Sequence, residues 1–96
     1  MRRCFLITYD ICDPKRLREV FKIMRSHGDH LQYSVFRCEL NRSELILLKD
    51  RLSDNIHHND DQILFVDLGP AAGRGKDCID SLGKKYSPPE RFVVVI

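Results

Sequence analysis

Residues 7–20, ITYDICDPKRLREV, contain the end of one predicted strand and the start of one predicted helix. The strand is expected over residues 3–10, because Phe, Leu, Ile, Thr and Tyr form a nearly continuous β-prone run there. The helix is expected to open at Asp13-Pro14, since Asp is a good N-cap and Pro suits the first helical position. Gly28 is predicted to end it. Its apolar stripe recurs at helical spacing and consists of Leu17, Val20, Phe21 and Met24.

Further elements follow on both sides of a second helix. Residues 30–40 are strand-like, with a break expected near residues 32–34, and residues 63–68 form another strand-like run. The helix between them opens with a capping-box pattern from Asn41 to Glu44. Its apolar face consists of Leu45, Leu48, Leu52 and Ile56. This order predicts an α+β fold, a ferredoxin-like βαββαβ sandwich with both helices on one face of an antiparallel sheet.

The ferredoxin-like core is assigned to residues 1–68, and residues 69–96 are assigned to a C-terminal loop and an extra edge strand of the same single domain. The chain ends in Phe92-Val93-Val94-Val95-Ile96, an uncharged and β-prone run. An open edge of this kind promotes aggregation, so the run is predicted to pair with a sheet. Pairing within the same subunit and pairing with the partner of a homodimer with packed sheets both remain open, and the second is favoured.

The composition bounds the class of protein. The chain has 96 residues, 43% hydrophobic and 31% charged, which indicates one globular domain. No apolar run is long enough to span a membrane and the start lacks a signal peptide, so a cytoplasmic protein without membrane contact is expected. The spacing of Cys4, Cys12, Cys38 and Cys78 includes no Cys-x-x-Cys pair, which favours buried thiols over a zinc site or a disulfide framework.

The first helix carries a row of basic residues. At about 100° per residue, four of them fall within an arc of roughly 80° opposite the apolar stripe, and Arg16 lies to one side. We call these four the basic ridge: Lys15, Arg18, Lys22 and Arg25. A ridge of this kind, together with Arg16 beside it, suits the phosphate backbone of a nucleic acid without reading its bases. A solvated helix face is the alternative.

Asp10 is a charged residue at the end of an apolar strand, where a carboxylate is costly unless something pairs with it. One interpretation is a carboxylate bound by backbone N–H groups near the helix start. The other is a ligand of Mg²⁺, which proteins hold with one or two carboxylates plus waters and phosphates. Asp13 is better used as the N-cap, so the second carboxylate of such a site would be Asp10 of the other subunit across a twofold axis.

Two further segments resemble functional motifs. The run from His57 to Asp61 could chelate a metal, but it joins a helix to a strand and is interpreted as a turn; Asp61 is singled out because it opens the strand. Gly73-x-Gly75-Lys76 resembles a phosphate-binding loop but lacks the Walker spacing, because Pro70 stands where the first glycine is required.

These residues also carry a family resemblance. Tyr9-Asp10-Ile11, the arginines of the first helix, Gly28 and Gln32-Tyr33-Ser34-Val35-Phe36 stand in the order seen in CRISPR-associated protein two, the small adaptation protein of CRISPR systems. The similarity covers residues 4–68 well. One departure is His30, where some members have an arginine; a neutral histidine would hold phosphate less firmly.

The resemblance implies a ferredoxin-like homodimer that acts in spacer acquisition. It implies that such dimers bridge copies of the CRISPR integrase (CRISPR-associated protein one) and that the basic ridges hold a double-stranded DNA prespacer. It also implies an Mg²⁺-dependent endonuclease activity, which some members show on RNA or DNA. The two Asp10 side chains would then be the metal ligands. By that pattern Tyr9, Arg16, Arg18 and Phe36 line or support the site.

Three function classes follow. The first is a DNA-binding adaptor for the integrase, which needs the ridge and the dimer. The second is primarily a metal-dependent phosphodiesterase, which needs Asp10 of both subunits. The third is a small-molecule regulatory module, since ferredoxin-like folds serve many functions. We rank the adaptor first and the nuclease second, and one protein can combine the two.

Overall fold

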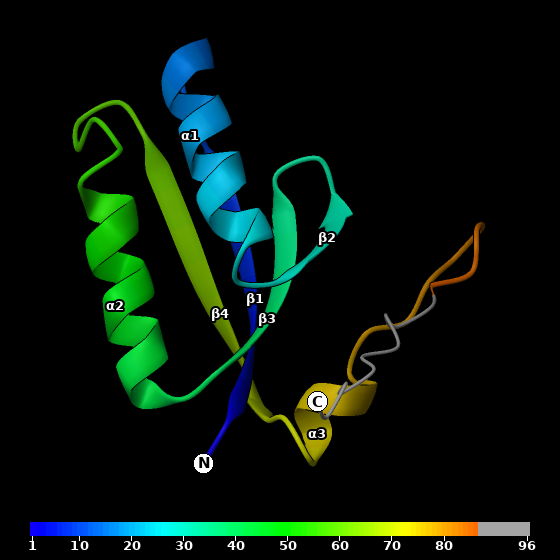
Figure 1. Ribbon diagram of the computed structural model, residues 1–96. Coiled ribbons are helices and arrows are strands. Elements are labelled where there is room, and N and C mark those ends of the chain that lie inside the picture. Colours follow the sequence, from blue (N-terminus) through cyan, green and yellow to red (C-terminus); the bar gives the residue numbers. More distant parts are fainter. Residues whose placement is uncertain (87–96) are drawn as a thin grey trace, which may run out of the picture.

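The computed structural model describes residues 1–86. Its elements, in chain order (Figure 1), are β1 (Arg3–Asp10), α1 (Pro14–Arg25), β2 (Asp29–Gln32), β3 (Val35–Leu40), α2 (Arg42–Ser53), β4 (Gln62–Pro70) and α3 (Arg74–Asp77). The predicted strand over residues 3–10 and the break between the next two strands are confirmed. The short helix α3 was not predicted and lies in the glycine-rich segment.

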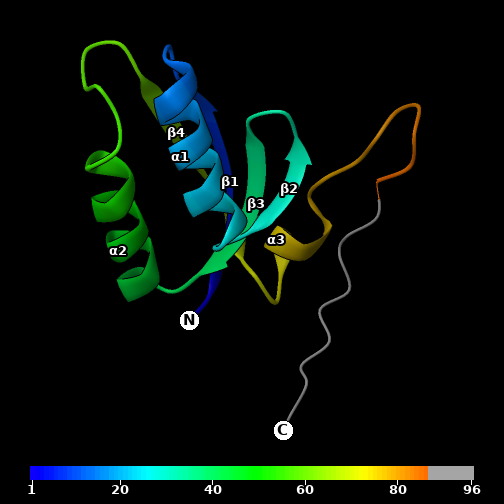
Figure 2. The same cartoon turned by 45° about the horizontal axis from the view of Figure 1, so that its top comes forward.

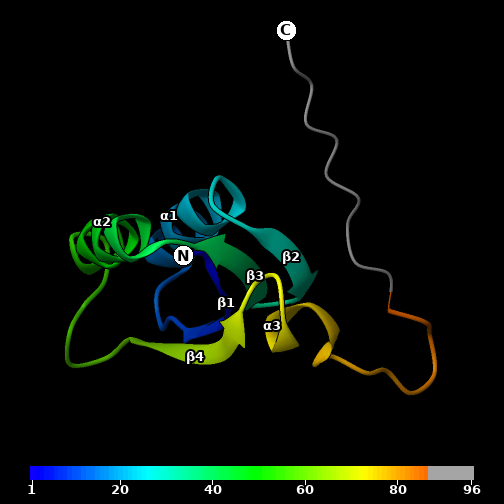
Figure 3. The ribbon, with the colours of Figure 1, turned by 90° about the horizontal axis from the view of Figure 1, so that it is seen from below.

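The four strands form one antiparallel sheet in the order β2-β3-β1-β4. Figure 3 shows α1 and α2 side by side on the same face of this sheet. This is the predicted ferredoxin-like arrangement. The predicted edge strand, Phe92–Ile96, lies outside the described residues.

The core lies between the sheet and the two helices. Ile7 of β1 pairs with Phe36 of β3 on one side and with Phe65 of β4 on the other. Met24 of α1 and Leu48 of α2 are both fully buried in the same core cluster. The core therefore joins the central strand to both helices, and it holds the end of β1 in place beside the start of α1.

Two helix starts follow the predicted local chemistry. The Asp13 carboxylate accepts a hydrogen bond from the Arg16 N–H at 2.9 Å, so Asp13 is the N-cap of α1. At α2 the Glu44 N–H donates to the Asn41 side chain at 2.8 Å and the Asn41 N–H donates to the Glu44 carboxylate at 2.9 Å. These bonds satisfy N–H groups that an uncapped helix start leaves without partners.

Gly28 has a different role from the one predicted. Helix α1 already ends at Arg25, and Gly28 follows with its N–H bonded to the Met24 carbonyl at 3.0 Å. A Cβ at this position would collide with the Cys38 sulfur and would lie 2.7 Å from the Arg37 carbonyl oxygen. The glycine is required because the chain passes close to β3.

The other face of the sheet carries no helix comparable to α1 or α2 among the described residues. Leu64 and Val66 of β4 lie on this face with 51% and 44% of their surface exposed. At one end α3 contacts it, where the buried Arg37 side chain donates to the Gly75 carbonyl at 3.2 Å. Within residues 1–86, no helix is both long enough and apolar enough to cross a membrane.

Candidate functional site

Asp10 is the last residue of β1 and pairs with Gln62 of β4. Its side chain is exposed and belongs to the sheet face that α1 and α2 do not cover, because Ile7 and Tyr9 alternate onto the helix face. Among residues 1–86, no group donates a hydrogen bond to its carboxylate. Within these residues Asp10 is therefore not bound by backbone N–H groups, as one interpretation proposed, and both of its oxygens are available.

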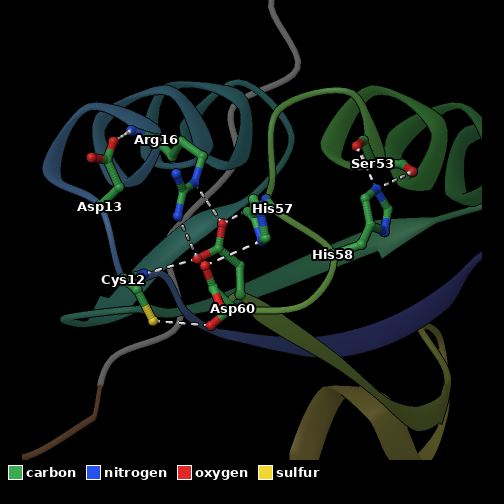
Figure 4. A network of polar contacts seen from close by, with 8 residues as sticks. Cys12, Asp13, Arg16, Ser53, His57, His58 and Asp60 are labelled. Atoms are coloured by element: carbon green, nitrogen blue, oxygen red, sulfur yellow. Dashed lines mark hydrogen bonds and ion pairs between the residues drawn. The ribbon is translucent and has the colours of Figure 1, made fainter.

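The buried carboxylate near this point is Asp61, whose side chain is 0% exposed. It accepts hydrogen bonds from the Cys12 N–H at 2.9 Å and the His57 N–H at 2.8 Å. Arg16 donates from Nε to Oδ2 at 2.7 Å and from Nη2 to Oδ1 at 3.2 Å. Figure 4 shows Cys12, Arg16 and His57 gathered at this contact from three segments: the turn after β1, helix α1 and the turn after α2. This cluster ties the turn after Asp10 to the start of β4.

The ion pair changes the properties of both residues. The Arg16 guanidinium, with the two backbone N–H groups, holds the pKa of the Asp61 carboxyl well below its usual range. Because the Arg16 guanidinium is paired with a buried carboxylate, it stabilises the turn and presents little charge to solvent. Sequence reasoning singled out Asp61 but missed this pairing.

The basic ridge extends along the exposed side of α1. All four of its side chains are exposed. Lys22 lies 3.4 Å from the Glu19 carboxylate, a solvent-exposed pair of small energetic weight. Within residues 1–86, Arg18 and Arg25 form no ion pair. Their charges are therefore available to an anion.

Tyr9 and Phe36 lie on the helix face, opposite the Asp10 carboxylate. Phe36 is fully buried, and its ring stacks on that of Tyr9 with 6.2 Å between centroids. Burial raises the pKa of the Tyr9 phenol above its usual value. Phe36 reaches no surface, so any contribution it makes to a site at Asp10 is to position β1 and β3.

The segment after α2 is a turn, as the sequence indicated. The Asp60 and Asp61 N–H groups both donate to the His57 carbonyl, at 3.1 and 2.9 Å. His58 donates from Nε2 to the carbonyl of Ser53, the last residue of α2, at 3.0 Å (Figure 4). The residues thus close the loop between α2 and β4.

Gly75 of the second candidate motif is buried, and a Cβ there would lie 2.7 Å from the Cys4 Cβ. A glycine at this position therefore allows α3 to pack closely against β1. The predicted burial of Cys4 and Cys38 is confirmed, while Cys12 is exposed.

The ligand chemistry at Asp10 fits a magnesium ion. A carboxylate whose two oxygens are both available is the kind of hard ligand that Mg²⁺ takes, with the remaining positions filled by water and phosphate oxygens. No group of three or more histidine, cysteine or acidic side chains within residues 1–86 is arranged to hold a metal.

Tyr33 belongs to the segment that carries the family resemblance, but no role was predicted for it from the sequence. It forms the turn between β2 and β3 with 95% of its surface exposed and a φ of 30°. Positive φ is uncommon and strained for an aromatic residue. The sequence feature that could have singled out Tyr33 is its position: an aromatic residue in a predicted break between two strands is expected to be exposed.

Comparison with known proteins shows one consistent similarity. Residues 2–72 match the family model described as CRISPR associated protein Cas2. The chain is 35% identical over 96 residues to a "CRISPR-associated endoribonuclease Cas2" of Geobacter sulfurreducens, covering 100% of both chains. It is 39% identical over 92 residues to "CRISPR-associated endoribonuclease Cas2 1" of Rhodospirillum rubrum, covering 96% of this chain and 89% of that relative. The crystal structure of Streptococcus pyogenes Cas2 superposes with a TM-score of 0.73 at 34% identity, over 83% of this chain and 99% of that one.

Proposed function

Since this chain belongs to the CRISPR-associated protein Cas2 family, we propose that it acts in CRISPR adaptation as a dimeric adaptor that holds nucleic acid for the integrase. The observation that carries this proposal is the basic ridge of α1, whose side chains are all exposed. Arg18 and Arg25 take no part in the Arg16–Asp61 ion pair, so their charges are available to a ligand. An exposed cationic row of this kind binds a phosphate backbone by releasing its counterions.

A homodimer completes the proposed adaptor. Leu64 and Val66 leave an apolar strip on the sheet face that lacks the two large helices. Packing this face against its twofold mate buries the strip and brings two basic ridges into one particle. The same packing turns the two Asp10 carboxylates toward the shared side. The integrase, and a double-stranded DNA prespacer or an RNA held by the ridges, are the further partners that we propose.

The ridge is tested by charge removal with a matched control. Arg18→Gln/Arg25→Gln removes two unpaired charges from α1, and Arg42→Gln/Arg51→Gln removes two exposed charges from α2. We expect the α1 variant to bind duplex DNA more weakly and to lower the slope of log K against log salt by about 2, roughly one unit per lost phosphate contact. The α2 variant should bind like the wild type.

The wider role requires a cellular readout. Neutralising all four ridge residues should abolish spacer acquisition in cells that also express the integrase, whereas Asp10→Asn should leave it nearly intact. Spacer acquisition that persists without the ridge charges would rule out the adaptor role, whatever the result for Asp10.

A second function, hydrolysis of a phosphodiester in RNA or DNA, is favoured by the available carboxylate of Asp10. The two Asp10 carboxylates of the dimer would together hold one Mg²⁺. When bound, the ion would polarise the scissile phosphate and lower the pKa of a coordinated water. The chain itself contributes by position: the Asp61 cluster fixes the turn that follows Asp10, Arg18 binds a neighbouring phosphate, and the Tyr9–Phe36 stack holds β1 against β3.

This second function is tested with a labelled oligonucleotide, with and without a chelator. Asp10→Asn should abolish magnesium-dependent cleavage, and Asp50→Asn, which alters an exposed carboxylate on α2, should not. Cleavage that survives both the chelator and Asp10→Asn would place the activity elsewhere. A cytoplasmic location is part of the proposal, because the nucleic acids that CRISPR adaptation uses are found there.

A further inference from the structure

A groove of about 590 Å³ lies between α1 and the β2–β3 turn, on the helix side of the sheet. Its apolar lining comes from Tyr9, Leu17, Phe21 and Tyr33. Leu17, predicted to face the core, is instead 37% exposed, because it faces this groove. The groove is separate from Asp10, whose side chain lies on the other face of the sheet.

One rim of the groove is cationic. Arg18, Lys22 and Arg25, three members of the basic ridge, line it together with the aromatic residues. Arg18 and Arg25 form no ion pair within residues 1–86. An aromatic surface beside unpaired cations matches a ligand that is flat and apolar at one end and anionic at the other. A nucleotide has this composition, with a base that stacks and a phosphate that pairs.

The turn that carries Tyr33 is held firmly in place. His30 donates from Nε2 to the Tyr33 carbonyl at 2.7 Å, and its ring contacts Phe21 and Phe36 with centroids 5.2 and 4.9 Å apart. The Tyr9 N–H donates to the Ser34 carbonyl at 3.1 Å. These contacts maintain a φ of 30° at Tyr33 while leaving its ring in solvent. Strain of this kind persists only where the surrounding structure enforces it, and it often marks a ligand contact. Figure 2 shows the turn at the end of the β2–β3 hairpin, and the lining of the groove places it beside α1.

We propose that this groove binds an unpaired nucleotide, with its base stacked on Tyr33 above the apolar floor and its phosphate on Arg18 and Arg25. The inference deepens the proposed function, on which it rests: it assigns to the ridge a preference for single-stranded segments or frayed ends over fully paired duplex. Fully paired DNA offers phosphates to the ridge but no base to the groove.

The test compares two single strands of about ten nucleotides, one with bases and one abasic throughout, so that charge and length match. Affinities are measured by fluorescence anisotropy in the Asp10→Asn background with a chelator present, which prevents cleavage. Tyr33→Ala should weaken binding of the base-bearing strand by about 5- to 150-fold, the range that loss of one stacked base produces. It should leave the abasic strand unchanged, and Tyr33→Phe, which keeps the ring, should resemble the wild type. A 2-aminopurine in the base-bearing strand should be quenched on binding, and Tyr33→Ala should remove the quenching.

The outcomes separate this inference from the function beneath it. If Tyr33→Ala affects both strands equally or neither, while Arg18→Gln/Arg25→Gln weakens both, the groove does not bind a base and the ridge proposal stands. If the arginine variant binds both strands like the wild type, the ridge proposal fails, whatever Tyr33 does. If Tyr33→Ala weakens only the association with the integrase, the groove is a protein-docking surface and the inference is wrong.

Discussion

Arg16 donates hydrogen bonds to both carboxylate oxygens of Asp61, a residue 45 positions further along the chain. The pair connects the first turn of α1 to the residue that precedes β4. The same carboxylate accepts the Cys12 and His57 N–H groups, so one buried charge organises two loops. Asp10 lies directly before one of these loops, and its position therefore depends on a contact made by Arg16.

Removing Arg16 should destabilise the fold. Arg16→Met leaves the Asp61 carboxylate buried without its cation, which is more costly than losing an exposed pair. We expect the melting temperature to fall by about 10 °C, and Arg16→Lys to fall less because it keeps the charge. Thermal unfolding followed by circular dichroism measures both. Arg18→Met, on the exposed ridge, is the control and should change little; an equal effect at the two positions would contradict the assignment.

The pH dependence of stability should follow from the same carboxylate. The pKa of Asp61 is lower in the folded chain than its ordinary value of 3.8, so the folded state binds fewer protons than the unfolded state. Its stabilising contribution is therefore present above about pH 5 and lost as the pH falls further. Asp61→Asn should be less stable at neutral pH and should lose less melting temperature between neutral pH and acid. A variant with the wild-type pH profile would show that other carboxylates, such as Asp67 beside Arg3, dominate.

Local sequence signals predicted much of this fold but not the contacts that complete its site. The N-cap at Asp13 and the capping box at Asn41 and Glu44 were predictable, because each acts within one helical turn. The Arg16–Asp61 pair was not, because its partners are distant in sequence and meet only when β4 lies beside β1. Helical periodicity placed Arg16 beside the ridge, and no local pattern shows that Arg16 forms an ion pair with a buried carboxylate.

The prediction for Gly28 shows the same limit. A glycine after a helical pattern is a good stop signal, and the helix does end nearby. The actual constraint is the approach of β3, which only the tertiary structure reveals. Asp10 is intermediate: its place at the end of β1 was predicted, whereas the exposure of its side chain and its lack of a donor within residues 1–86 were not.

Gly28→Ala should therefore destabilise the protein through packing. The new methyl group would collide with the Cys38 sulfur and with backbone of Arg37, which cannot move aside as a side-chain end could. Overpacking of this kind costs about 1–3 kcal/mol. Urea unfolding measures the change in free energy, with Ser43→Ala, at an exposed position of α2, as a control within about 0.5 kcal/mol of the wild type. A Gly28→Ala variant as stable as this control would show that β3 can shift at little cost.

The apolar strip on the open sheet face should determine the oligomeric state. Leu64→Glu and Val66→Glu place charges where the proposed dimer buries two sheets against each other, and an unpaired buried carboxylate opposes association. We expect both variants to sediment as monomers at concentrations where the wild type is a dimer. Ile46→Glu and Leu47→Glu introduce the same change at residues that are 57% and 68% exposed on α2, on the opposite layer, and should remain dimeric. If the α2 variants dissociate and the β4 variants do not, the subunits associate through their helices, and the two Asp10 carboxylates cannot share one metal ion across the sheets.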